Sequence, residues 1–332
     1  MAITIQILPS GRKFVSEGNS NLLEAGLRSG LALGYGCSNG NCGECLAKII
    51  SGEVQKVRHH DYRISAESQA SGYVLMCCNT AITDIVLEAP EASDSSEIPD
   101  QSITARVKST VIVNDDVALI HLKTPRTNRL RFLAGQYVLL GGSNMPVAAH
   151  SISSCPCDDM NLHFQIPGLS GNEFSDHVFN QLQKGDTIDI NGPQGDFVLN
   201  ENSPRPLVFI AWHTGFGPVR SLIEHAMALD VTGDIHLAWI ARNKNDRFLD
   251  NLCRSWNDAM DDFNYVPIDA DLSDSAIDAE SIFEKLNIKP GNLADFDFYI
   301  AGNSLLSDSC KKYLISNGLP VEQLRIDQLI HV

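Results

Sequence analysis

Alternating apolar and polar positions predict the elements of the first quarter of the chain. Residues 3–7 and 14–15 alternate as strands do, on either side of a turn at 9–11. Helical spacing over 20–29, ended by a glycine, predicts a helix. Further strands are expected at 46–50 and 85–87. A small α+β unit therefore opens the chain.

A polar segment with proline at both ends, residues 90–99, is typical of a linker. Beyond it the pattern is all-β, with short strands separated by Gly and Pro, which indicates a barrel or a sandwich. The expected strands are 103–107, 117–122, 137–140, 162–166 and 187–190.

From about residue 206 strands alternate with helices. This alternation predicts a parallel sheet of the doubly wound type. The expected strands are 207–211, 235–240 and 296–301, and the expected helices are 218–229, 247–260 and 305–317. The fold class is thus multidomain, α+β followed by all-β and α/β.

Length and composition agree with several globular domains. The chain has 332 residues, enough for two or three domains at the usual size. No apolar run approaches the ~20 residues of a membrane span, and no signal peptide is recognisable. Nine cysteines without a secretion signal favour a reducing cytoplasm over disulfides. Four of them are expected to be free and buried: Cys155, Cys157, Cys253 and Cys310.

The formal net charge of −16 argues against nucleic acid as a partner, because its binders need basic patches. Residues 1–92 carry 7 basic and 9 acidic side chains, and residues 203–332 carry 11 and 19. A solvated acidic surface explains this imbalance, and a partner with a basic docking patch is the other interpretation.

Cysteine spacing supplies the clearest chemistry. Cys37, Cys42 and Cys45 are spaced C-x₄-C-x₂-C, and Cys77 follows at a distance. Four thiolates in this pattern are the ligands of a plant-type 2Fe-2S cluster. Zinc sites usually present two C-x₂-C pairs, and only one such pair occurs here. Cys78 competes with Cys77 for the place of the fourth ligand.

Residues 1–92 resemble a plant-type ferredoxin domain, which implies a β-grasp fold. The segment Leu75-Met76-Cys77 stands where that family has Leu-Ala-Cys. The resemblance therefore implies that Cys77, rather than Cys78, is the fourth cluster ligand.

Six later motifs, in their order along the chain, resemble those of the ferredoxin-NADP⁺ reductase superfamily. They are 132–138 (FLAGQYV), 150–154 (HSISS), 184–186 (KGD), 192–197 (GPQGDF), 214–218 (TGFGP) and 299–303 (YIAGN). With the N-terminal ferredoxin, the chain resembles the reductase components of bacterial multicomponent oxygenases. The resemblance implies a 2Fe-2S domain (1–92), a linker (93–101), an antiparallel FAD-binding β-barrel (102–202) and a doubly wound NAD(P)-binding domain (203–332).

The resemblance also assigns cofactors and site residues. A flavin takes up a hydride and releases electrons singly, so FAD can connect NADH or NADPH to a one-electron cluster. Ser151 is expected near the flavin N5 edge as the catalytic residue. The other expected cofactor-binding residues are His150, Ile152, Ser153, Gly171, Phe174, Ser175, Thr214, Gly215, Arg242 and Gly302.

Several positions depart from the family pattern. The Arg that neutralises the flavin phosphate is replaced by Ala148, and the Tyr that covers the ring by His150. The acidic and aromatic residues expected near the C-terminus, two positions apart, correspond in this alignment of motifs to Leu329 and His331. Further departures are Trp212 and His213 for two glycines of the nicotinamide turn, and Ala301-Gly302-Asn303 for Cys-Gly-Pro.

Two functions are compatible with these observations. The first is an NAD(P)H-dependent reductase that passes electrons through FAD and the cluster to a terminal oxygenase or hydroxylase, with reduction of a sugar-nucleotide intermediate beside a dehydratase as a variant. The second is a non-catalytic electron-transfer or assembly subunit with a degenerate nicotinamide site. In the family, Arg242 would lie on the adenosine side of the cofactor, which keeps NADPH as an alternative. The resemblance to oxygenase reductases favours NADH.

Overall fold

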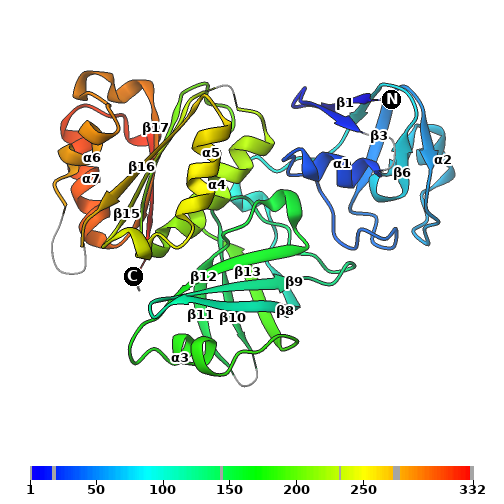
Figure 1. The fold of residues 1–332 in the computed structure, drawn as a ribbon. Helices are drawn as coiled ribbons and strands as arrows, with labels where there is room; N and C mark the ends of the chain where they lie inside the picture. Colours follow the sequence, from blue (N-terminus) through cyan, green and yellow to red (C-terminus); the bar gives the residue numbers. More distant parts are fainter. Residues whose placement is uncertain (1, 17–19, 143–144, 232, 272–276, 330–332) are drawn as a thin grey trace.

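The computed structural model describes residues 2–16, 20–142, 145–231, 233–271 and 277–329. The chain forms three bodies in sequence order, each built on its own sheet (Figure 1). No helix in these described ranges combines the length and the apolar character needed to cross a bilayer.

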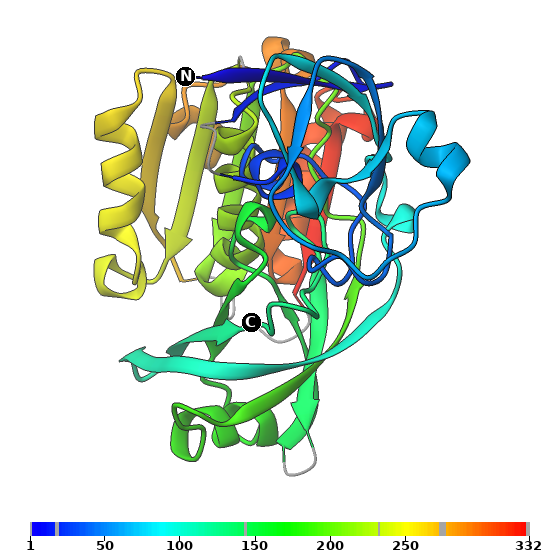
Figure 2. The ribbon, with the colours of Figure 1, turned by 90° about the vertical axis from the view of Figure 1, so that its right-hand side faces the viewer.

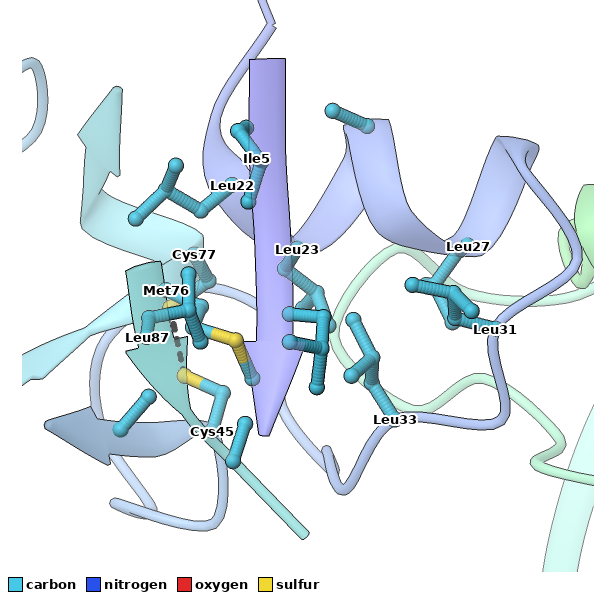
Figure 3. Packing of buried hydrophobic residues seen from close by; sticks show 14 of the residues in the cluster. Ile5, Leu22, Leu23, Leu27, Leu31, Leu33, Cys45, Met76, Cys77 and Leu87 are labelled. Atoms are coloured by element: carbon cyan, nitrogen blue, oxygen red, sulfur yellow. Dashed lines mark hydrogen bonds between the residues drawn. The ribbon is translucent and has the colours of Figure 1, made fainter. Parts of the chain in front are cut away.

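The first body is a five-stranded mixed sheet in the order β2-β1-β7-β3-β5, with helix α1 packed on it. The strands are β1 (Ile3–Leu8), β2 (Lys13–Ser16), β3 (Leu46–Ser51), β5 (Tyr73–Leu75) and β7 (Ile85–Glu88), and the helix is α1 (Leu22–Arg28). Short elements complete it: β4 (Val54–Lys56), α2 (Ala66–Ala70) and β6 (Asn79–Ala81). Apolar side chains of α1 and the sheet form one core, which extends to Cys45 and Cys77 (Figure 3).

The second body is a six-stranded antiparallel, barrel-like sheet in the order β11-β10-β13-β8-β9-β12. Its elements are β8 (Gln101–Asn114), β9 (Val117–Lys123), β10 (Tyr137–Gly142), β11 (Met145–Ser151), β12 (Asn161–Pro167), α3 (Glu173–Asn180) and β13 (Thr187–Gln194). The five expected strands are confirmed. β8 continues seven residues beyond its expected end, as one arm of a hairpin with β9.

The third body is a five-stranded parallel sheet in the order β16-β15-β14-β17-β18. Its strands are β14 (Leu207–Trp212), β15 (Ile235–Ala241), β16 (Phe263–Asp269), β17 (Asp297–Gly302) and β18 (Leu324–Gln328). The helices are α4 (Phe216–Ala228), α5 (Asp250–Ala259), α6 (Ala279–Lys285) and α7 (Ser304–Ser316). Separate apolar cores form on the two faces of the sheet, as expected for the doubly wound type.

Buried charges connect the first body to the second. The Arg129 guanidinium donates to Asp159 at 3.1 Å and also contacts Glu24 of α1. The Tyr35 hydroxyl donates to the other oxygen of Asp159 at 2.5 Å. Burial raises the pKa of Asp159 to about 6, against the opposing effect of Arg129. We call these four residues, Glu24, Tyr35, Arg129 and Asp159, the junction network. The first body lies beside the other two in Figure 1, and Figure 2 views the molecule from that side.

One expectation about cysteines is wrong. Cys155 and Cys157 form a disulfide within the turn Cys155-Pro156-Cys157. The turn brings their Cα atoms to 5.1 Å, within the range that a disulfide spans. Cys253 and Cys310 are free and buried, as expected.

Candidate functional site

The four predicted cluster cysteines form two pairs. Cys37 and Cys42 are joined through backbone amides: the Cys42 amide donates to Cys37 Sγ at 3.3 Å, and the Cys37 amide to Cys42 Sγ at 3.4 Å. Cys45 Sγ and Cys77 Sγ are 3.2 Å apart, as the dashed line in Figure 3 marks. Among the described residues, no three His, Cys, Asp or Glu side chains converge on one point as a single metal ion would require.

This arrangement fits a two-iron cluster, in which each iron takes two protein thiolates. The Asn41 amide also donates to Cys37 Sγ at 3.3 Å, and the Glu44 amide to Cys42 Sγ at 3.4 Å. Such N–H···S bonds favour the ionised thiolate that binds iron. Cys45 and Cys77 are buried, whereas Cys42 is exposed, so one edge of the site faces solvent.

Close packing around the loop explains two of its glycines. Both have a positive φ, and a Cβ on Gly43 would lie 2.3 Å from the Tyr62 ring. A Cβ on Gly40 would lie 2.6 Å from His60 and 2.9 Å from Cys78 Sγ. The Cys78 sulfur thus lies against the loop, 3.6 Å from Cys77 Sγ. Cys77 remains the predicted ligand because its sulfur meets that of Cys45.

A cavity of about 600 Å³ lies where the barrel meets the parallel sheet. Its walls come from residues 137, 146–151, 165–167, 169, 171–175, 214, 217–218 and 327–329. The cavity opens beside the carboxyl ends of β14 and β17, between which the strand order reverses. In doubly wound sheets, ligands bind in the crevice at this position.

Ser151 and Asp327 form a hydrogen-bonded pair in the cavity. The Ser151 hydroxyl donates to Asp327 Oδ2 at 3.2 Å. Burial raises the pKa of Asp327 to about 6; the Ser151 hydroxyl opposes the shift and the charge of Asp196 adds to it. The motif alignment predicts the C-terminal acidic position at Leu329, whereas the structure puts the acid at 327 and Leu329 in the cavity wall. His331 lies outside the described residues.

Two buried side chains in the wall have polar atoms without a partner among the described residues. Both amide atoms of Gln165, on β12, and the Thr214 hydroxyl are unsatisfied. These residues are 6% and 4% exposed. A buried polar group without a hydrogen bond costs roughly 1–3 kcal/mol. Their place in the cavity wall, together with Ser151 and Asp327, fits a flat, polar-edged ring such as a flavin.

The cavity offers few groups that could bind the phosphates of the expected FAD. None of the 25 Lys and Arg residues, all in described parts of the chain, lines the cavity, whereas Glu173 and Asp327 do. The Ser175 amide at the start of α3 already donates to Asn172 Oδ1. The Ser175 hydroxyl is bound to Pro167 and Leu169. The Glu173 and Phe174 amides remain as anion donors at this helix N-terminus.

The nicotinamide turn keeps its glycine where the backbone needs it. A Cβ on Gly215 would lie 2.2 Å from the Ala301 carbonyl oxygen, so this turn packs directly on the end of β17. Trp212 packs against Gly302 instead of entering the cavity. The His213 ring is turned toward Phe248, and burial lowers its pKa. Trp212 and His213 therefore do not fill the cavity formed by the described residues.

Arg242 is already paired in the structure. It contacts Asp116, at the β8–β9 turn of the barrel, and donates to Asp246 at 2.9 Å. The guanidinium therefore bridges two bodies, and its contact with the adenosine end of a cofactor stays a prediction.

The structure brings part of the predicted set together. The predicted residues in the cavity wall are His150, Ser151, Gly171, Phe174, Ser175 and Thr214. The predicted residues outside it are Ile152, Ser153, Gly215, Arg242 and Gly302. The His150 ring packs against Phe174 in a tilted arrangement, with the ring centres 4.7 Å apart. Sequence reasoning missed Gln165 and Asp327, because neither belongs to a motif.

Three known families match consecutive parts of the chain, one for each of the three main sheets. Residues 5–83 match the family "2Fe-2S iron-sulfur cluster binding domain", 104–199 match "Oxidoreductase FAD-binding domain", and 209–312 match "Oxidoreductase NAD-binding domain". The chain therefore carries domains for all three predicted cofactors.

Whole-chain relatives share this order. CDP-6-deoxy-L-threo-D-glycero-4-hexulose-3-dehydrase reductase of Yersinia pseudotuberculosis is 28% identical over 99% of both chains. Terephthalate 1,2-dioxygenase reductase component 2 of a Comamonas species is 29% identical, over 97% of this chain and 96% of the relative. The solved Amycolatopsis cytochrome P450 reductase GcoB is similar in fold, with a TM-score of 0.62, 23% identity and 98% coverage of both chains.

Proposed function

Because this chain belongs to the ferredoxin-NADP⁺ reductase superfamily, in the branch with an N-terminal plant-type 2Fe-2S domain, we propose that it is an NADH-dependent reductase of a cytoplasmic oxygenase or hydroxylase system. Electrons would pass from NADH through FAD to the cluster held by Cys37, Cys42, Cys45 and Cys77, and then to the terminal component. The reductase relative of terephthalate dioxygenase supports this assignment of the partner.

The observation that carries the proposal is the Ser151–Asp327 pair inside the cavity, at the reversal of strand order. FAD supplies the conversion between a two-electron hydride and single electrons. Ser151 would present a hydroxyl to the reacting edge of the ring, and Asp327 fixes the direction of that hydroxyl. Gln165 and Thr214 would supply hydrogen bonds to the ring's polar rim. These groups would hold and orient the ring.

The turn at 213–215 would position the nicotinamide cofactor. Its backbone lies at the end of β14 and at the start of α4, where the positive end of the helix dipole favours a phosphate. Gly215 allows the turn to pack on the end of β17. These features favour an active enzyme over a non-catalytic subunit.

A second partner has specific support. The Yersinia relative is named as the reductase of a hexulose dehydrase, and it covers this chain as fully as the oxygenase reductase does. Under this candidate the same electron route would end on a sugar-nucleotide dehydrase. The cluster and the cavity are identical in the two candidates, so the partner alone separates them.

An anaerobic stopped-flow experiment tests the electron route. NADH should bleach the flavin absorption first and the cluster absorption afterwards. The Cys77→Ser variant serves as the matched control, since its flavin should still be reduced while the second phase disappears. If neither NADH nor NADPH reduces the flavin, while dithionite reduces both centres, the reductase assignment is wrong.

A further inference from the structure

The surface beside the exposed cluster edge is basic, in contrast to the rest of the chain. Residues 56–63 (KVRHHDYR) hold three of the seven Lys and Arg residues of the first 92 positions. Lys56, Arg58 and Arg63 are all exposed. We call these three side chains the basic rim. The whole chain, by comparison, has a formal net charge of −16.

Three contacts hold this segment against the cluster loop. The Arg58 guanidinium donates to the Ser38 carbonyl at 2.9 Å, one residue after Cys37. The Tyr62 amide donates to the Gly40 carbonyl at 3.0 Å. The Tyr62 ring lies on Gly43, the neighbour of the exposed Cys42. The basic rim therefore flanks the edge through which an electron can leave the buried pair of sulfurs.

Residues 56–63 hold one carboxylate, that of Asp61, against three Lys and Arg side chains, so the segment keeps a formal charge of +2 with His neutral. Asp61 lies 3.8 Å from His59, and both are exposed. The Glu44 carboxylate is turned onto Gly36, where a Cβ would lie 2.7 Å from it. Within the described chain, neither the Lys56 nor the Arg63 side chain has an ion-pair or hydrogen-bond partner. Val57, 55% exposed between Lys56 and Arg58, adds an apolar contact to the patch.

We propose that the basic rim is the docking surface for the electron acceptor, and that the acceptor presents an acidic face to it. This inference rests on the proposed function, because it takes the cluster as the exit for electrons. Exposed charges around an interface act mainly on the rate of association, by steering the partner into place. The acidic remainder of the chain repels the same acidic face, so an acceptor is directed to the cluster edge.

The test uses the holoprotein with its centres reduced photochemically beforehand, so that it does not depend on nicotinamide. Electron transfer is followed to an acidic acceptor, cytochrome b5, and to a basic one, cytochrome c. The double variant Lys56→Glu/Arg63→Glu should slow transfer to cytochrome b5 about five- to tenfold at low ionic strength and accelerate transfer to cytochrome c. Both effects should shrink at about 0.5 M salt, where screening is strong.

Lys13→Glu is the matched control. Lys13 is an exposed residue on β2, at the sheet edge opposite β5 and the Cys77 end of the sheet. It should alter neither rate. Equal changes with both acceptors, no change, or the same effect from Lys13→Glu would overturn the proposal. So would a self-association of the native chain that the double variant abolishes, because the rim would then bind a second copy. If the double variant loses its cluster absorption, Lys56→Gln/Arg63→Gln replaces it.

Discussion

The cluster loop and the flavin cavity secure their groups in opposite ways. Three of the four cluster sulfurs come from nine consecutive residues, 37–45, and the loop's own amides bond to two of them. The cavity wall is gathered from segments between residues 137 and 329, across two bodies. A site built by one loop is little affected by substitutions elsewhere in the chain. A site assembled from several segments can be altered by substitutions in any one of them. Most of the departures from the family pattern accordingly lie at the flavin and nicotinamide end.

The largest effect is expected at the cluster. Cys77→Ser should abolish or severely weaken the cluster, because Cys77 Sγ meets Cys45 Sγ at 3.2 Å in the buried pair. Cys78→Ser should retain it. Iron content and visible absorption measure both variants. Loss of the cluster in the Cys78 variant alone would reverse the assignment of the fourth ligand.

The next effect concerns the acid of the cavity. Asp327→Asn should slow flavin reduction by NADH about a hundredfold, the order of loss expected when the group that orients a reacting side chain is removed. In the native protein the rate should rise through pH 6, as Asp327 ionises and accepts the Ser151 hydroxyl, and Asp327→Asn should flatten this profile. Asp196→Asn should move the inflection below 6, because the Asp196 charge contributes to the raised pKa. An inflection near 6 that persists in Asp327→Asn would assign it to another group.

The raised pKa of Asp327 also predicts the direction in which the stability of the fold changes with pH. A carboxyl with a folded-state pKa of about 6 binds its proton more tightly than in the unfolded chain, where the value is about 4. Its favourable contribution is complete below about pH 4 and is lost as the pH rises through 6. Asp327→Asn should therefore reduce the decline in stability across this range, as thermal unfolding at a series of pH values would measure.

A smaller effect is expected from restoring a cation to the cavity wall. Native FAD binding should be weak and partly reversed by gel filtration, since no Lys or Arg lines the cavity. Ala148→Arg should tighten FAD binding about ten- to a hundredfold, as one charge-assisted hydrogen bond allows. Riboflavin, which lacks phosphate, is the matched control ligand and should gain nothing. Tight stoichiometric FAD in the native protein would show that other groups already hold the pyrophosphate.

The smallest effect is expected at the nicotinamide end. Arg242→Ala should raise KM for NADH a few-fold and leave kcat nearly unchanged, as for a remote contact. Asp116→Asn is the informative partner variant, because it frees Arg242 from the barrel. If Arg242 binds the cofactor, Asp116→Asn should leave KM unchanged or lower it. A parallel rise in KM in both variants would instead identify the pair as a contact between the two bodies.

The same contrast explains what the sequence can predict. The cysteine spacing and the strand alternation are local signals, so the sequence alone predicts the cluster loop and most of the strands. It misses β16 because Pro267 interrupts that strand, and β18 because it mixes Arg325 and Asp327 with few apolar residues. Without β18 the register of the C-terminus is undetermined, and Asp327 is overlooked. Gln165 gives no signal because only the folded barrel shows that its amide lacks a partner.

The junction network affects how the rate of electron transfer from the flavin to the cluster depends on solution conditions. Domains within a chain usually move relative to one another unless their interface is large and hydrophobic, and buried hydrogen bonds between them add to the cost of such motion. Here Arg129 and Asp159 of the second body bond to Glu24 and Tyr35 of the first, and all of these except Glu24 are buried. The two bodies are then held at a fixed separation, so electron transfer between them should not depend on solvent viscosity. Without the bond, the same step would become a search by a tethered domain, governed by the linker's effective concentration.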